Sequence, residues 1–338
     1  MSKSLTFITS IFYLFNSING ILIPRNVDLT LVSEVDEEAS SGGLIGEQNS
    51  GSAVAVSIPT SQSSKVTSSY TSSQVSPTGS FYSGATGITY SPYQKDGSCK
   101  TELMIQSDMQ TIADFSVIRI YDTDCNAIPF ILQALIGSQK IMVGIYNIDA
   151  IPQSVSIISS AFNGDFSKVY AISVGNELVN SGIKSPNQIQ TAVNSAKSQL
   201  SAIGYNGPIV SVDTLIAYVN NPSLCQYSDF LAVNSHPYWD GNVEPSSCGT
   251  WLGDQISNLQ SKCGTDKPIL ITETGWPTQG QSFGNCVPSQ QNQINCVSSI
   301  TQSHGSQVIL FTTFNDYWKQ PGPYGVEQYW GLFGSPSS

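Results

Sequence analysis

Charge of either sign is scarce in this sequence. Only 11% of its 338 residues are charged, against about a quarter in an ordinary soluble protein. Acidic residues outnumber basic ones by 24 to 13, which gives a net charge of -11, and no basic stretch is present to neutralise phosphates. The composition therefore argues against a nucleic acid or an anionic membrane surface as a partner. A neutral polymer substrate or an acidic extracellular medium fits it better.

Residues that commonly bind metals are few as well. The chain has two histidines, His236 and His304, and no Cys-x-x-Cys pair, so we expect no zinc site and no cofactor. Seven cysteines remain. In a secreted protein they predict disulfides, and the odd count leaves at least one thiol without a partner in the chain. Cys99 and Cys125 each follow a predicted strand by a few residues, so they are candidates to meet at one face of the domain.

Long apolar runs are missing except near the N-terminus. There, Lys3 precedes an apolar run over residues 5–18, and Gly20 provides a small residue near a cleavage point. This pattern predicts a secretory signal peptide over residues 1–20. A membrane anchor is the alternative, but the run is shorter than the roughly 20 apolar residues that span a bilayer. No later segment is apolar enough, so we expect a secreted, extracellular protein with no membrane span.

Residues 21–80 show no clear period. In the stretch 57–80, 14 of 24 residues are Ser or Thr, a composition that cannot bury a core and predicts disorder. We interpret the segment as an N-terminal arm, either O-glycosylated or an unmodified linker, and as a candidate pro-region. No Asn-x-Ser/Thr sequon with x other than proline occurs in the chain, so N-glycosylation is not expected.

From residue 81 to residue 338, short apolar runs alternate with helical stretches. Eight runs are predicted to be strands: 87–92, 117–122, 140–147, 169–177, 208–214, 230–238, 268–277 and 307–316. A helix is predicted over 185–203, with Ser185 as its N-cap and Gly204 past its end, and another ends at Gly264. Eight such units over about 250 residues predict one α/β domain, a (β/α)8 TIM barrel. An open doubly wound sheet would give the same alternation, but no G-x-G-x-x-G follows the first run.

Two of these runs end near a glutamate. Glu177 closes the fourth run, and Glu273 lies near the end of the seventh. Catalytic residues of a TIM barrel sit at the carboxyl ends of its strands, and strands four and seven face each other across the mouth. A facing pair of carboxylates is what glycosidic bond cleavage requires. A lone glutamate at a strand end is more often a salt-bridge partner or a cap, but two on opposite strands favour catalysis.

Neighbouring side chains extend the predicted site. Asn176 immediately precedes Glu177 and offers an amide to a sugar hydroxyl. Trp276, in a Gly-Trp-Pro turn, offers a ring face on which a pyranose would stack, and the alternative is a packed turn residue. Arg119 lies inside an apolar run and needs a carboxylate partner, for which a catalytic glutamate would serve. Tyr90, at the end of the first strand, would line the same mouth.

Further candidates lie at later strand ends. His236 and Tyr238 end the sixth run and are placed to hydrogen-bond the nucleophile, although a lone histidine is more often structural. Late in the chain, the segments FNDYWK and VEQYWGLF carry Trp318, Lys319 and Glu327. These segments suit binding-site walls and barrel-closing packing equally well. Glu327 would either bind substrate or hold Lys319 in place.

These motifs together resemble glycoside hydrolase family 17, which includes plant and fungal β-1,3-glucanases and fungal cell-wall glucanosyltransferases. The similarity runs from about residue 87 to residue 333 and rests on VGNE and ITETGWP, supported by RIYDTDC, DYWK and EQYWGLF in the expected order. The resemblance implies a retaining mechanism on β-1,3-linked glucan, with Glu177 as acid/base and Glu273 as nucleophile. The serine-rich extension further suggests the fungal cell-wall members, and the resemblance then implies that this arm contacts cell-wall polymers.

Three alternatives stay open. A β-1,3-glucanosyltransferase would use the same two glutamates and pass the glycosyl group to a second glucan. A wall adhesin or mannoprotein with weak catalysis would fit the Ser/Thr-rich arm and the odd cysteine, but it has no reason to keep Glu177, Glu273 and Asn176 together. A lectin-like glucan-binding module would still bind after both glutamates were lost.

Overall fold

The structure is a computed structural model that describes residues 15–18, 21–24 and 80–336. The first two stretches form a two-stranded antiparallel sheet, in which β1 (Phe15–Ile18) pairs with β2 (Ile21–Pro24). The rest of the predicted signal peptide (1–20) and nearly all of the predicted Ser/Thr-rich arm (21–80) lie outside the described residues. The domain boundaries proposed for this part of the chain therefore stay predictions.

Eight parallel strands form a closed barrel. In chain order they are β3 (Gly87–Thr89), β4 (Val117–Arg119), β5 (Lys140–Ile145), β6 (Val169–Asn176), β7 (Ile209–Thr214), β8 (Leu231–Asn234), β9 (Ile269–Thr274) and β10 (Val308–Leu310). Each strand pairs with the next, and β10 pairs with both β9 and β3, which closes the ring. The predicted TIM barrel is confirmed, and the open doubly wound sheet is excluded.

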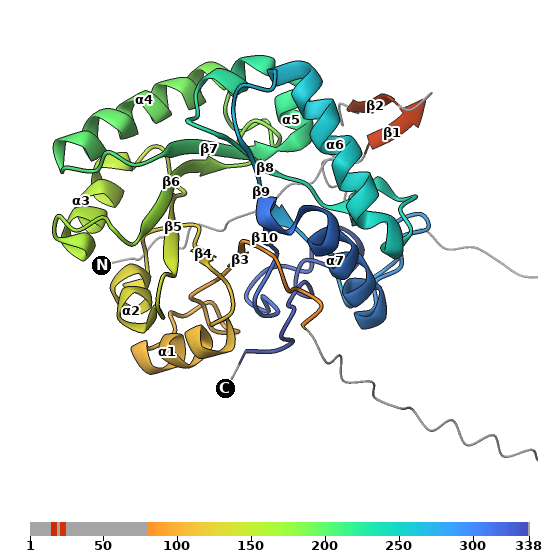
Figure 1. The fold of residues 1–338 in the computed structure, drawn as a ribbon, viewed down its shortest axis with the longest axis horizontal. Helices are drawn as coiled ribbons and strands as arrows, with labels where there is room; N and C mark the ends of the chain where they lie inside the picture. Colours follow the sequence, from red (N-terminus) through yellow and green to blue (C-terminus); the bar gives the residue numbers. More distant parts are fainter. Residues whose placement is uncertain (1–14, 19–20, 25–79, 337–338) are drawn as a thin grey trace, which may run out of the picture. The chain divides into compact units, whose positions relative to one another are not determined.

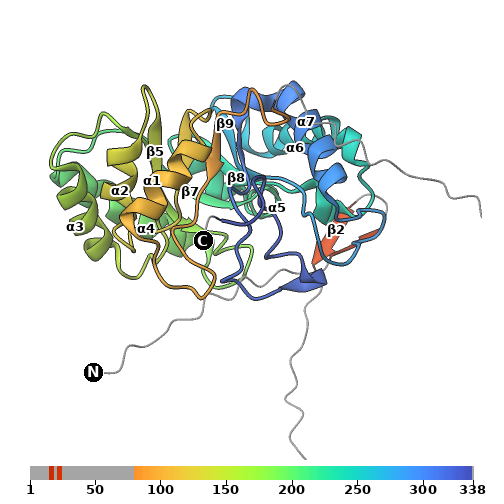
Figure 2. The same cartoon turned by 90° about the horizontal axis from the view of Figure 1, so that it is seen from below.

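A helix follows each of the first seven barrel strands. The helices are α1 (Glu102–Thr111), α2 (Ala127–Ala134), α3 (Ile151–Phe162), α4 (Pro186–Ala202), α5 (Leu215–Asn220), α6 (Cys248–Cys263) and α7 (Gln290–His304). Short 3-10 turns occupy Pro222–Gln226, Pro237–Asp240, Pro245–Ser247, Gly305–Gln307 and Pro323–Gly325. The helices lie around the outside of the strands (Figure 1), with α1 to α4 on one side of the barrel and α5 to α7 on the other (Figure 2). Among these helices none is long and apolar enough to cross a membrane.

The ends of the predicted helices follow their capping residues. Ser185 Oγ accepts a hydrogen bond from the Gln188 amide, while the Gln188 side chain accepts one from the Ser185 amide. This capping box satisfies two amides that a helix N-terminus otherwise leaves unpaired. Pro186 takes the first helical position, where its missing N–H costs nothing. At the other end, Gly204 has a φ of 91°, and α6 likewise stops before Gly264, so both predicted helices are confirmed.

The apolar residues of the strands fill two separate layers. One layer lies inside the barrel and is made of Val117, Met142, Ala171, Val210, Val212, Ala232, Leu270 and Ile309. Strand neighbours such as Ile141 and Val143, on either side of Met142, belong to the larger cluster that includes the helices. Both faces of the strands are therefore covered, which explains why the runs are almost continuously apolar. At roughly 1.5–3 kcal/mol for each buried aliphatic side chain, this double layer gives the loops at the strand ends a rigid base.

Six of the seven cysteines form disulfides. The pairs are Cys99–Cys125, Cys225–Cys263 and Cys248–Cys296, and Cys286 is free and buried. The predicted pairing of Cys99 with Cys125 and the predicted leftover thiol are both confirmed. The first disulfide joins the loops that follow β3 and β4, whereas the other two tie α6 to its neighbours on the outside of the barrel.

Candidate active site

A cleft opens at the carboxyl ends of the barrel strands. Its wall combines the ends of β6, β8 and β9 with the loops that follow β3, β4, β5 and β10. Seven of the sequence-predicted residues line it: Asn176, Glu177, His236, Glu273, Trp318, Lys319 and Glu327. Arg119 is buried and reaches this set from the end of β4. The structure thus brings residues from positions 119 to 327 into one site.

A β-bulge aims Glu177 into the cleft. Val174 pairs with Ser211 and Asn176 pairs with Val212 on the next strand, so Gly175 is an extra residue in β6. Gly175 has a φ of 73°, and a Cβ there would lie 2.9 Å from Leu178 Cδ1. Only glycine fits such a left-handed position without strain.

The residue after the bulge is itself in an unusual conformation. Glu177 has a φ of 54°, which a residue with a long side chain adopts at a cost of about 1–3 kcal/mol. Its amide donates to the carbonyl of Val212 at 3.0 Å, which ties the strained residue to β7. Strain of this kind is typical of functional positions, where the surrounding structure enforces it.

Glu273 is held by one of its two oxygens. Oε1 accepts from Arg119 Nη1 at 2.9 Å and from the Tyr121 hydroxyl at 2.8 Å. Oε2 has a single and longer contact, 3.4 Å to His236 Nε2. The bonded oxygen is therefore fixed by two charge-assisted hydrogen bonds, and Oε2 is the oxygen left available to a substrate in the cleft.

Arg119 connects the two halves of the site. Besides Glu273, its guanidinium donates to the Thr272 carbonyl and to Asn176 Oδ1, each at 2.8 Å. The Tyr121 ring lies under its Cζ at 4.6 Å, a cation–π contact. The side chain is only 1% exposed, and the charge of Glu273 compensates for this burial.

The environment drives the two carboxyl groups to opposite protonation states. Burial raises the pKa of Glu177 to about 8, helped by the negative charges of Glu273, Asp213 and Glu327 and opposed by a hydrogen bond from Asn234. Burial alone would also raise the pKa of Glu273, but the hydrogen bond from His236, the charge of Arg119 and the bond from Tyr121 lower it to about 2. At neutral pH one group keeps its proton and its partner is ionised, which is the arrangement of an acid and a nucleophile.

Charged side chains from the segment that follows β10, Lys319 and Glu327, also line the cleft. Lys319 Nζ forms an ion pair with Asp316 Oδ2 at 3.0 Å. Glu327 is 7% exposed, burial raises its pKa to about 7, and its Oε1 has no hydrogen-bond partner within the described chain. The same is true of Trp330 Nε1. Buried polar atoms are normally paired, so an acceptor and a donor in the wall of one cleft are available to ligand hydroxyls.

The prediction that Trp276 and Tyr238 reach the cleft is wrong. Trp276 has no exposed surface, its Nε1 donates to the Val287 carbonyl at 3.0 Å, and its ring packs edge-on against Tyr238. The Tyr238 hydroxyl donates to the Gln281 carbonyl at 2.6 Å. A 3-10 turn begins at Pro237 and turns Tyr238 away from the face on which His236 lies.

Tyr90 also points away from the cleft, because of strand alternation. Thr89 pairs with Arg119 across β3 and β4, so the next residue along, Tyr90, faces the helices. It is fully buried, and its hydroxyl donates to Asp108 Oδ2 at 2.7 Å. Asp108 also pairs with buried Lys100. The predicted role of Tyr90 in lining the mouth is therefore wrong.

Several aromatic residues of the cleft were not predicted. Tyr121, Tyr146, Trp239 and Tyr93 all line it. Tyr121 was detectable, because it lies two residues after Arg119 and so on the same face of the chain. The other three lie in loops after β3, β5 and β8, where no period in the sequence indicates which way a side chain points.

One wall of the cleft consists of two packed aromatic rings, Tyr93 and Trp318, and of Asp124, which hydrogen-bonds to Tyr93. The rings of Tyr93 and Trp318 lie 4.6 Å apart between centroids, inclined by 57°. The Tyr93 hydroxyl donates to the Asp124 carboxylate at 2.9 and 3.1 Å. This wall therefore combines side chains from the loops after β3, β4 and β10.

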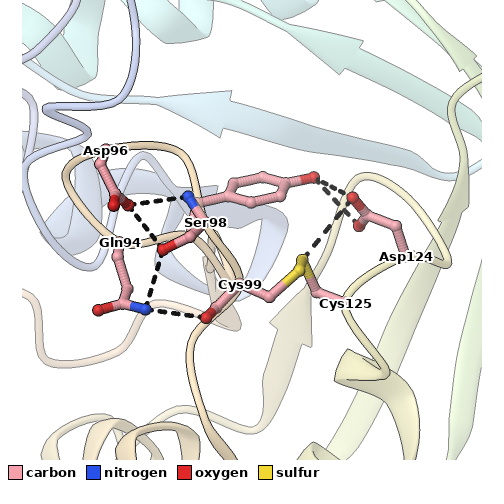
Figure 3. The surroundings of a disulfide bond; sticks show 7 residues. Gln94, Asp96, Ser98, Cys99, Asp124 and Cys125 are labelled. Atoms are coloured by element: carbon pink, nitrogen blue, oxygen red, sulfur yellow. Dashed lines mark hydrogen bonds between the residues drawn. A yellow bond between two sulfur atoms is a disulfide. The ribbon is translucent and has the colours of Figure 1, made fainter. Parts of the chain in front are cut away.

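A disulfide fixes that wall from behind. Cys99 and Cys125 join the two loops that carry Tyr93 and Asp124. Figure 3 shows this disulfide beside Asp124 and the polar residues of the segment 94–98, which hydrogen-bond to one another. The loop after β3 is thus folded on itself and covalently tied to its neighbour.

Comparison with known proteins agrees with this architecture. Residues 87–331 match the family described as the BtgE/BtgC glycoside hydrolase domain. The chain is 48% identical over 255 residues to "Probable family 17 glucosidase SCW4" of Saccharomyces cerevisiae, covering 75% of this chain and 66% of that protein. It is 47% identical over 252 residues to "Cell surface mannoprotein MP65" of Candida albicans, covering 74% and 67%. The chain thus spans about two thirds of the length of these relatives.

Among solved structures, a similar fold occurs in an active-site mutant of Rhizomucor miehei β-1,3-glucanosyltransferase in complex with laminaritriose. The TM-score is 0.63 at 22% identity, covering 75% of this chain and 94% of that one. At this identity the likeness concerns the fold alone. The sequence match is more specific, since it contains the whole barrel and both cleft glutamates, and the chain therefore belongs to glycoside hydrolase family 17.

Proposed function

We propose that the protein is a secreted cell-wall glycosidase that cleaves β-1,3-glucan by a retaining double displacement. Glu273 is the nucleophile and Glu177 the acid/base. The observation that carries this proposal is that Glu177 and Glu273 line one cleft in opposite environments. Arg119 and Tyr121 donate to Glu273 and favour its ionised form, whereas burial beside other carboxylates raises the pKa of Glu177 to about 8. The substrate class is carried over from the family and from the names of its members.

In the first step, Glu273 Oε2 attacks the anomeric carbon of the bound glucosyl unit. Arg119 and Tyr121 hold Oε1, so the attacking oxygen is presented in one orientation. The glycosidic bond breaks as the ester bond forms, and Glu177 gives its proton to the departing sugar oxygen. The products are a covalent glycosyl-enzyme and a shortened glucan.

In the second step, Glu177 acts as the base. Formation of the ester removes the negative charge of Glu273, which is one cause of the raised pKa of Glu177, so the deprotonated state of Glu177 becomes easier to maintain. An incoming hydroxyl transfers its proton to Glu177 and attacks the anomeric carbon. The ester breaks, and ionised Glu273 is restored.

The incoming hydroxyl can belong to water or to a second glucan chain. Aromatic side chains line the cleft from four separate loops, through Tyr93, Tyr146, Trp239 and Trp318. Such a spread of stacking surfaces favours binding of sugar units on both sides of the cleavage point, which a glucanosyltransferase needs. Transfer to glucan is therefore our second candidate function.

Location in the cell wall is part of the proposal. It is supported by the name of the Candida albicans relative, a cell surface mannoprotein, and by the predicted signal peptide. The Ser/Thr-rich arm would then contact wall polymers. A wall adhesin with weak catalysis is the competing hypothesis, and turnover by the purified protein separates the two.

The test is to incubate the purified protein with a reduced linear β-1,3-glucan oligosaccharide and to follow the products by mass spectrometry. Shorter products alone indicate hydrolysis, and products longer than the substrate indicate transfer. Glu273→Gln should abolish turnover and leave glucan binding largely intact, whereas Glu244→Gln, at an exposed glutamate, should change neither. An unchanged substrate with the wild-type protein would refute the proposal.

A further inference from the structure

Outside the cleft, one buried carboxylate, that of Asp213, hydrogen-bonds to the backbone of the turn that follows Glu177. Asp213 lies near the end of β7 and is 3% exposed. Its Oδ2 accepts from the Val179 amide at 2.8 Å, and its Oδ1 accepts from the amides of Asn180 and Thr214 at 3.1 and 2.9 Å. Asp213 does not line the cleft, so these three backbone bonds account for its position.

The turn itself resembles the first turn of a helix. The Ser181 amide donates to the Glu177 carbonyl, and the Gly182 amide donates to the Val179 carbonyl, each at 3.0 Å. The amides at the start of such a turn have no partner within it and need an acceptor from elsewhere. Asp213 supplies that acceptor from the neighbouring strand, in the manner of an N-cap side chain.

Strand β7 therefore holds the chain on both sides of Glu177. At Glu177 itself, the Val212 carbonyl accepts from the backbone amide at 3.0 Å. Later in the sequence, the Asp213 carboxylate accepts from the amides of Val179 and Asn180. Glu177 has a left-handed φ of 54°, a conformation that persists only when its surroundings enforce it.

We propose that Asp213 is a positioning residue for Glu177, whose carboxylate fixes the turn that aims the acid/base side chain into the cleft. The inference rests on the proposed role of Glu177 and goes beyond it, because it assigns the alignment of the acid to a residue that touches neither substrate nor Glu177's side chain. A small displacement of the Glu177 carboxyl is enough to slow proton transfer, because a misplacement of about 1 Å can lower the rate 100-fold.

Asp213 also acts on Glu177 through its charge. Burial and nearby negative charge raise the pKa of Glu177, and Asp213 is one source of that charge. The groups that face Glu177 come from five elements: Asp213 on β7, Glu273 on β9, Asn234 on β8, Tyr146 after β5 and Glu327 after β10. Removing the charge of Asp213 leaves the other four in place, so the pKa of Glu177 should fall and remain above its ordinary value.

The test compares Asp213→Asn with wild type, Glu177→Gln and Asp229→Asn. Asp229 is a matched control, because its carboxylate accepts from the Ile209 amide at the opposite end of β7 and pairs with Lys197. Each protein is assayed on an unactivated β-1,3-glucan oligosaccharide and on an aryl oligoglucoside with a dinitrophenyl leaving group, which needs no protonation to depart.

For Asp213→Asn we expect kcat/KM on the unactivated substrate to fall by about 10- to 100-fold, with a change of less than about threefold on the activated one. Azide, which attacks the glycosyl-enzyme without a base, should raise kcat of this variant on the activated substrate. The alkaline limb of its pH profile should move to lower pH. Asp229→Asn should show none of these changes.

Equal losses on both substrates, or no loss on either, would overturn the proposal. A failure of Glu177→Gln to show the same selectivity would instead refute the role of Glu177, which separates the two hypotheses. If Asp213→Asn does not fold, Asp213→Glu decides, because it keeps the charge and moves it by one methylene. That variant should lose activity selectively while its alkaline limb stays in place, and uniform activity would overturn the positioning role.

Discussion

Replacing Glu177 by glutamine should make the protein more stable at neutral pH. The pKa of this carboxyl is raised from 4.5 to about 8 in the folded protein. The folded state therefore binds the proton more tightly than the unfolded chain does, and the wild type loses stability as pH rises from 4.5 to 8. Glutamine keeps the shape and the acceptor for Asn234, which donates to Glu177 Oε1 at 2.8 Å, but it carries no titrating proton.

The size of the effect follows from the pKa difference. Between pH 4.5 and pH 7 lie 2.5 units, and one unit corresponds to about 1.36 kcal/mol, which gives an upper figure of about 3 kcal/mol. Because the carboxyl lies in the wall of an open cleft, water screens part of this, and we expect about 1–3 kcal/mol. The difference between variant and wild type should vanish near pH 4 and grow up to about pH 8.

Urea unfolding with the disulfides intact, repeated at each pH unit from 4 to 8, measures this difference directly. Glu273→Gln is the comparison of opposite sign. The pKa of the Glu273 carboxyl is lowered to about 2 in the folded protein, so the stability that this carboxylate contributes is present above about pH 4.5 and is lost as pH falls towards 2. The substitution should lower the stability at pH 7 by about 3–5 kcal/mol, because it leaves Arg119 without a charge partner. A stability difference for Glu177→Gln that does not change with pH would refute the electrostatic account.

Other expectations concern activity. The kcat/KM of wild type should fall above about pH 8, as Glu177 loses its proton, and below about pH 2, as Glu273 gains one; a profile lacking the alkaline limb would contradict the acid assignment. Tyr121→Phe removes one of two strong donors to Glu273 Oε1 and should lower kcat by about 10- to 150-fold, because a hydrogen bond to a charged group is worth about 1.5–3 kcal/mol. Replacing Cys99 and Cys125 together by serine should lower stability by about 3–4 kcal/mol and raise KM for long oligosaccharides more than for short ones.

The sequence was sufficient to predict the barrel, because each strand is covered on both faces and each unit repeats the same apolar pattern. It was also sufficient for the two glutamates, since the end of a barrel strand is a defined place. Along an extended chain, alternate side chains point to the same face, so the position of Tyr121 in the cleft can be inferred from that of Arg119 two residues earlier. The prediction for Tyr90 was wrong because the sequence does not show which residues of β3 and β4 are paired. Once Thr89 is known to pair with Arg119, Tyr90 must face the helices.

Beyond the strand ends the sequence was insufficient. Tyr238 sits one residue inside a 3-10 turn, and the turn sends it into the core. Trp276 lies three residues past Glu273, where its ring is covered and its nitrogen bonds the Val287 carbonyl. The role of Asp213 could not be read from the sequence, because its partners are backbone amides, and every residue type except proline can supply those.

The disulfides are distributed unevenly, and this bears on how the barrel opens. All three lie within residues 99–125 or 225–296, so the stretch from 126 to 224 contains no crosslink. That stretch holds β5, β6 and β7 together with α2, α3, α4 and α5. When this stretch detaches from the rest of the barrel, it becomes a long loop held only at its two ends, and it gains more entropy than chain inside a disulfide-closed loop does. Amide hydrogens of β6 should therefore exchange through a partial opening that leaves α6 and α7 protected, so the strand that leads to Glu177 belongs to the least stable unit of the fold.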